Sequence, residues 1–196
     1  MPHSVPVPAR KTRPSANAPR APRWRTLASS PLVENPDVRV TRDDARCGDG
    51  PAHARPVVDF GMNAVVAAAR TSDGHWALVG RQGYATRRFG WEFPGGPLVR
   101  GELPQSAAAF ELARCAGMRA WGWRRQGAWD PLPDALPMSC AVMVAEGAQK
   151  NTDARREDPF VPVRLVTDAQ MDGLVRSGRV RDAATLAAWA ILRGRG

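Results

Sequence analysis

Short apolar runs separated by turn residues fill the middle of the chain and predict closely spaced strands. Runs rich in β-branched and small apolar residues cover residues 57–60 and 62–70. Ser72-Asp73-Gly74 is typical of a hairpin turn, and residues 76–79 then return as a buried strand. Further strands are expected at residues 38–40, 140–145 and 160–166, the last interrupted by Pro162.

The stretch of residues 91–118 changes from a strand pattern to a helix pattern. Its Pro94-Gly95-Gly96 step predicts a turn, because proline fixes one dihedral angle and glycine adopts conformations that other residues avoid. A helix is expected to begin with Pro104 at its first position, where no amide donor is needed, and to end at Gly117. Two more helices are expected near the C-terminus, one capped by Asp168 and one capped by Asp182.

Three segments read as irregular connections: residues 47–56, residues 130–137 with three prolines, and the polar residues 147–158. Residues 119–129 carry Trp121, Trp123 and Trp129, and Trp121 and Trp123 are expected on one face of a strand. Core or dimer packing is favoured for this aromatic set over stacking on a nucleotide base.

The net charge of +9 over 196 residues is concentrated at the N-terminus. Residues 1–25 hold six basic residues and no acid, and residues 1–23 lack apolar periodicity. We therefore expect a disordered basic tail at residues 1–23, followed by a single domain at residues 24–196. Contact with nucleic acid is expected only through this tail, and a merely solvated tail is the favoured interpretation.

Other composition signals are sparse. There is neither the apolar core of a signal peptide nor a stretch long enough to span a membrane. The three cysteines, Cys47, Cys115 and Cys140, have no metal-ligand spacing and fit a reducing environment, so a cytoplasmic location is expected.

The central stretch resembles the signature of the Nudix hydrolases, which cleave a nucleoside diphosphate linked to another group. Six of its residues stand where that signature requires them: Gly96, Glu102, Glu111, Leu112, Gly117 and Met118. Three depart from it, with Phe110 in place of an arginine and Arg114 and Cys115 in place of paired glutamates. The resemblance implies an α/β fold, the Nudix α/β/α sandwich with a mixed β-sheet.

The departures bear on metal binding, because residues 111, 114 and 115 share one face of a helix. In the family, carboxylates on that face hold Mg²⁺, which requires oxygen ligands. Cys115 is a soft sulfur ligand, while Arg114 repels a cation and can pair with Glu111 itself. Mg²⁺ binding, if it persists, is expected to be weak and to rest on Glu102 and Glu111, which are also the candidate catalytic residues.

Much of the chain, residues 24–193, is similar to the ADP-ribose pyrophosphatase branch of that family. The branch uses its N-terminal strands for dimer formation, so a homodimer is implied. It also carries a water-activating glutamate in the loop matching residues 130–137, where Asp134 is the only acid between Pro131 and Pro137 and stands in the wrong register. The candidate ligand-binding residues are Gly95, Gly96, Arg81, Arg88 and Arg114.

The sequence leaves three functions open. The first interpretation is a binder of a nucleoside-diphosphate-type small molecule, or a weakly active hydrolase, with a degenerate catalytic box. The alternative is a functional divergent pyrophosphohydrolase using Glu102 and Glu111 with Mg²⁺. A nucleic-acid accessory role through the tail is the third. Whether the chain is an enzyme stays open, because the family predicts hydrolysis and these residues predict little of it.

Overall fold

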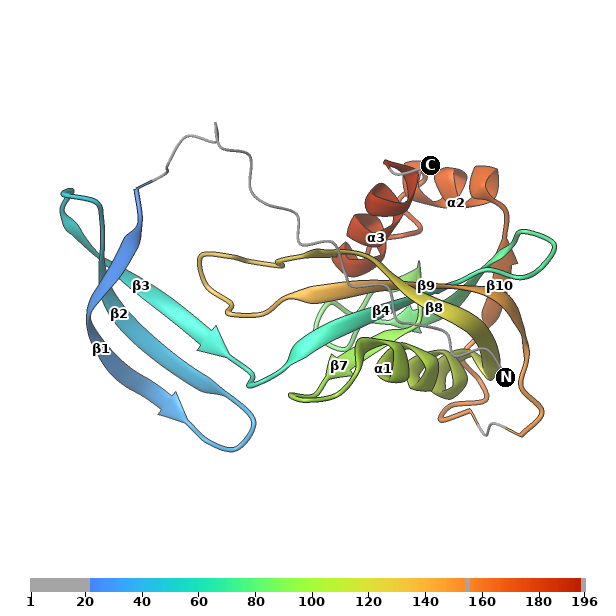
Figure 1. The fold of residues 1–196 in the computed structure, drawn as a ribbon, viewed down its shortest axis with the longest axis horizontal. Helices are drawn as coiled ribbons and strands as arrows, with labels where there is room; N and C mark the ends of the chain where they lie inside the picture. Colours follow the sequence, from blue (N-terminus) through green and yellow to red (C-terminus); the bar gives the residue numbers. More distant parts are fainter. Residues whose placement is uncertain (1–21, 154–155, 195–196) are drawn as a thin grey trace, which may run out of the picture.

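The computed structural model describes residues 22–153 and 156–194, so most of the predicted tail lies outside the described residues. Figure 1 shows a small N-terminal sheet standing beside a larger body in which helices cover both faces of the strands. Across the described residues, no helix is long and apolar enough to cross a membrane.

The N-terminal sheet is an antiparallel meander of β1 (Trp24–Glu34), β2 (Arg39–Cys47) and β3 (Ala52–Asp59). Asn35 closes its first turn, because its Oδ1 accepts the backbone N–H groups of Asp37 and Val38, both at 2.9 Å. The prediction of a loop over residues 47–56 is wrong for residues 52–56. Residues 52–56 pair with β2 along β3, and only the glycine-containing turn before them is irregular.

The described part of the body contains two sheets. One has the order β7-β4-β9-β8, with β4 and β9 parallel and the other pairs antiparallel, and the second has the order β10-β5-β6. The strands are β4 (Asn63–Ala69), β5 (Trp76–Gln82), β6 (Phe89–Glu92), β7 (Gly95–Leu98), β8 (Met118–Trp129), β9 (Cys140–Lys150) and β10 (Val163–Val166). The predicted turn is present, since the N–H of Thr71 donates to the carbonyl of His75 at 2.8 Å. The expected hairpin is limited to one isolated bridge, Arg70 with Trp76, because β4 and β5 belong to different sheets.

Over residues 22–153 and 156–194, three α-helices and one π-helical turn complete the body. The helix α1 (Pro104–Glu111) continues into η1 (Leu112–Ala116), and Gly117 ends it in the left-handed conformation with a φ of 63°. On the opposite face lie α2 (Asp168–Arg176) and α3 (Ala183–Arg193) (Figure 1). The expected cap at Asp182 is confirmed, whereas the cap of α2 is Thr167, whose hydroxyl accepts the N–H of Gln170.

Alternation along the central strands divides the core into two layers. In β4, Val65 and Ala67 pack in the cluster on the α1 side, whereas Val66 and Ala68 pack in the cluster with residues of α2 and α3. The strands β5 and β9 alternate in the same way. Strands buried on both faces read as continuous apolar runs, as this sequence does. The predicted α/β/α sandwich with a mixed sheet is confirmed.

Four local expectations are wrong. Gly95 and Gly96 lie in β7, paired with β4, and the chain instead changes sheet at the two residues before them. The strand β9 continues to Lys150, into the expected polar loop, while β10 begins only after Pro162. In β8, register shifts surround Gly122, which has a φ of 64°, so Trp121 is 52% exposed while Trp123 packs against the core.

Candidate functional site

The two glycines of β7 allow a close approach rather than forming a phosphate loop. A Cβ on Gly95 would lie 2.8 Å from the carbonyl oxygen of Val65 in the neighbouring strand. A Cβ on Gly96 would collide with the carboxylate of Glu111. Glycine at position 96 therefore makes room for this carboxylate between β7 and α1.

Glu111 is buried, with 3% of its surface exposed, and its charge is met by neighbours on its own helix. Arg114 donates to Glu111 Oε2 from Nε at 3.1 Å and from Nη2 at 2.5 Å, and the Cys115 thiol donates to the same oxygen at 3.4 Å. The expected pairing of Arg114 with Glu111 is confirmed. These hydrogen bonds raise the pKa of the Arg114 guanidinium above its ordinary value. Arg114 also pairs with Glu157.

Cys115 joins this pair to the neighbouring sheet. Arg81 of β5 donates from Nη2 to Cys115 Sγ at 2.6 Å. Burial raises the pKa of the Cys115 thiol, although the charges of Arg81 and Arg114 oppose that rise. A protonated thiol at this position supplies no negative charge to a cation.

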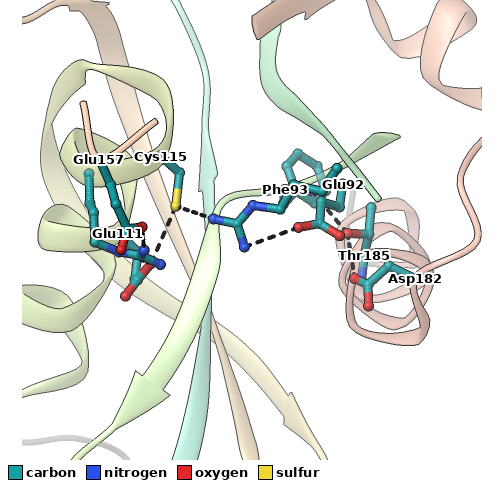
Figure 2. Close-up of polar contacts among 9 residues, drawn as sticks. Glu92, Phe93, Glu111, Cys115, Glu157, Asp182 and Thr185 are labelled. Atoms are coloured by element: carbon teal, nitrogen blue, oxygen red, sulfur yellow. Dashed lines mark hydrogen bonds and ion pairs between the residues drawn. The ribbon is translucent and has the colours of Figure 1, made fainter. Parts of the chain in front are cut away.

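Arg81 also pairs with the neighbouring strand β6, where its Nη1 lies 3.4 Å from Glu92 Oε1. Figure 2 shows Cys115 and Glu92 at the two ends of these contacts. Burial raises the pKa of Glu92 from 4.5 to about 7, the charge of Arg81 lowers it in part, and the charge of Asp182 raises it further. Asp182 itself accepts from both the N–H and the hydroxyl of Thr185, at 2.7 and 2.8 Å. Through its contact with Cys115, Arg81 thus connects the Glu111 side of the helix to the Glu92 carboxyl group, which titrates near neutral pH.

A cleft of about 550 Å³ opens beside these contacts. Its walls come from β5, the start of β6, η1 and the segment before β10. The lining residues are Gly80, Arg81, Gln82, Phe89, Arg114, Cys115, Glu157, Asp158, Phe160, Val161 and Pro162. The lining thus combines two arginines with apolar side chains, among them Phe160, which is 91% exposed.

The residues present do not fit a Mg²⁺ site of the kind that the resemblance implies. Glu111 is engaged by Arg114 and Cys115, and neither of these supplies an oxygen ligand. Glu102 is exposed in the loop before α1, where its Oε2 accepts the N–H of Val99 at 3.3 Å. Among residues 22–153 and 156–194, no group of three or more His, Cys, Asp or Glu is placed to hold one metal ion.

The structure brings together only part of the predicted set. Gly96, Glu111, Arg114 and Arg81 form one connected group through the contacts of the Glu111 carboxylate and the Cys115 thiol. Glu102 lies outside that group, and within the described part of the chain it makes no hydrogen bond or ion pair with Glu111. Gly95 packs on β4, and Arg88 lines a separate hollow.

Sequence reasoning missed Glu92 and Glu157. For Glu92 a signal existed, because it is a lone acid between Trp91 and Phe93 in an apolar run. For Glu157 none existed, since its pairing with Arg114 joins residues 43 apart in the chain.

Comparisons with known proteins give the fold alone. No family model matches the sequence, and no curated protein matches it. Among solved structures, the chain is similar to one described as the crystal structure of an ADP compounds hydrolase. The TM-score is 0.78 with 17% sequence identity, over 91% of this chain and 96% of that one. The protein thus has a Nudix-like α/β fold.

Proposed function

We propose that the protein binds a nucleoside-diphosphate-type small molecule in the cleft between β5 and η1, with weak or no Mg²⁺-dependent hydrolysis. The observation that carries this proposal is the Arg114 guanidinium, which covers the Glu111 carboxylate and also lines the cleft. The positively charged Arg114 side chain therefore lies on the helix face where the family that this sequence resembles binds a metal ion.

The chemistry of the cleft suits a diphosphate. Guanidinium groups bind phosphate oxygens through paired N–H donors and keep their charge at all physiological pH values. Arg81 and Arg114 both border the cleft, and each already holds a position through carboxylate or thiol contacts. The similar solved protein is described as acting on ADP compounds, which supports the same class of ligand here.

Titration calorimetry with ADP and ADP-ribose, each with and without Mg²⁺, tests the proposal. Binding is expected without Mg²⁺, and Arg114→Gln should weaken it by about tenfold or more, because one charged hydrogen bond contributes roughly 1.5–3 kcal/mol. Arg125→Gln is the control, since Arg125 is exposed on β8 and outside the cleft.

Turnover of the same compounds distinguishes the binder from the enzyme. Little or no product is expected with Mg²⁺ present. Brisk Mg²⁺-dependent cleavage that Glu111→Gln abolishes would overturn the proposal and establish the divergent pyrophosphohydrolase that uses Glu102 and Glu111.

We further propose that the N-terminal sheet forms a homodimer contact. Every residue of β1 is exposed, including large apolar side chains at Leu27 and Leu32, which are 50% and 60% exposed. Light scattering after size exclusion should give twice the chain mass, and Leu27→Glu with Leu32→Glu should give the monomer. The matched control is Leu165→Glu, at an exposed leucine of the body. A wild-type monomer at micromolar concentration would contradict this proposal.

A further inference from the structure

A second hollow, of about 390 Å³, lies between β6 and the turn that joins α2 to α3. Its lining is Arg88, Phe89, Trp91, Gly178, Arg179 and Arg181. Three of these six residues are arginines and none is an acid. Phe89 borders both this hollow and the cleft, whereas Arg81 and Arg114 line only the cleft.

Backbone hydrogen bonds hold the turn in place. The N–H groups of Arg179 and Val180 donate to the carbonyl of Leu174 at 2.9 and 3.1 Å, and Val180 is 3% exposed. The N–H of Trp91 donates to the carbonyl of Arg179 at 2.9 Å, which ties the turn to β6. The arginines at 179 and 181 therefore extend from a fixed backbone, and a ligand need not order the turn to meet them.

The acids nearest in sequence do not neutralise these arginines. Asp182 caps α3 and Glu92 pairs with Arg81. Within the part of the chain that the structure describes, the guanidinium groups of Arg88, Arg179 and Arg181 make no ion pair. Three uncompensated charges around one concave surface attract an anion that carries several charges.

The aromatic side of the hollow suits a planar group. Phe89 is 53% exposed, and Trp91 holds it edge-on at 5.7 Å between ring centroids with an 84° interplanar angle. An exposed ring held by a second ring presents a face on which a nucleobase can stack.

We propose that this hollow binds a nucleoside polyphosphate, with the phosphate chain on Arg88, Arg179 and Arg181 and the base against Phe89. The site is separate from the diphosphate cleft and does not depend on the function proposed for it. Its cationic part recognises the phosphate chain alone, and its aromatic part adds affinity for the nucleoside.

The test uses the full chain titrated with inorganic tripolyphosphate and with ATP, without Mg²⁺, at physiological salt. Both are expected to bind. Arg179→Gln combined with Arg181→Gln should weaken both by about a hundredfold, because removing one guanidinium from a phosphate reduces affinity by about tenfold. Phe89→Leu should weaken ATP binding about fivefold or more and leave tripolyphosphate binding unchanged, because only ATP carries a base.

Two control variants separate this site from the cleft. Arg125→Gln should change neither titration, and circular dichroism should show each variant folded. The tripolyphosphate binding that the double variant removes should persist in Arg114→Gln, even where this variant weakens binding of phosphates in the cleft. Two results would overturn the proposal. The first is that neither probe binds at about 1 mM, the weakest affinity considered. The second is that Arg114→Gln removes tripolyphosphate binding and the double variant does not.

Discussion

The carboxyl group of Glu92 should make the protein less stable as the pH rises through neutrality, and Glu92→Gln should remove that dependence. Burial raises the pKa of Glu92 in the folded protein from 4.5 to about 7. Below pH 4.5 both the folded and the unfolded chain hold this proton. Between pH 4.5 and pH 7 the unfolded chain releases it while the folded protein keeps it, so the free energy of unfolding falls with rising pH.

The size of the effect follows from the distance between the two pKa values. Each pH unit between them changes the free energy of unfolding by about 1.4 kcal/mol, which gives roughly 3 kcal/mol over the whole interval. The Glu92 side chain is 23% exposed, so solvent screening reduces this. We expect about 2 kcal/mol. Glutamine keeps an oxygen that Arg81 can donate to but carries no charge to desolvate.

Urea unfolding of the wild type and of Glu92→Gln at pH 5, 6, 7 and 8 measures the difference. The variant should gain stability relative to the wild type as the pH rises, by about 2 kcal/mol between pH 5 and pH 8. Glu34→Gln, at an exposed acid of β1, serves as the control and should show no such trend. A stability difference between Glu92→Gln and the wild type that stays constant over this range would refute the reasoning.

Three further predictions concern the helix, the glycine before it and the tail. Millimolar Mg²⁺ should barely change the melting temperature of the wild type, whereas the triple variant Phe110→Arg, Arg114→Glu and Cys115→Glu should show a clear Mg²⁺-dependent rise in scanning fluorimetry. Gly96→Ala should cost about 1–3 kcal/mol in urea unfolding, because its methyl group collides with a buried carboxylate; an unchanged midpoint would contradict this. Deleting residues 1–23 should leave the melting temperature unchanged and abolish any salt-sensitive binding to RNA or DNA in a filter assay; binding that survives would place the phosphate-binding surface on the body.

The layers of the fold could be predicted because local signals agree with the final packing. The start of α1 at Pro104 and the end of its helical stretch at Gly117 follow from proline and glycine chemistry, and both are observed. By contrast, the pairing of Gly95 and Gly96 in β7 depends on the neighbouring strand β4. A glycine in a turn and a glycine at a close approach give the same sequence signal.

The site could be predicted where its contacts are local and not where they join distant segments. The Arg114–Glu111 pair follows from their spacing of three residues on a helix. The contact of Arg81 with Cys115 spans 34 residues and depends on how β5 meets η1. The π-helical turn at residues 112–116, which carries both Arg114 and Cys115, has no sequence signature in this chain.

Charge on this helix face decides which kind of ligand the cleft attracts. The signature that the sequence resembles has carboxylates at the three positions 111, 114 and 115, a charge of −3. Here Glu111 contributes −1, Arg114 contributes +1 and the buried Cys115 thiol contributes none, so the face is neutral. Two unit charges 4 Å apart interact by roughly 4 kcal/mol near a protein surface, so replacing two carboxylates by one guanidinium and one neutral thiol removes most of the attraction for a divalent cation. The Arg81 guanidinium adds a positive charge beside that neutral face. A phosphate group can pair with these guanidinium groups without a metal ion, and this is the physical basis of the proposal that the cleft binds a diphosphate with weak or no hydrolysis.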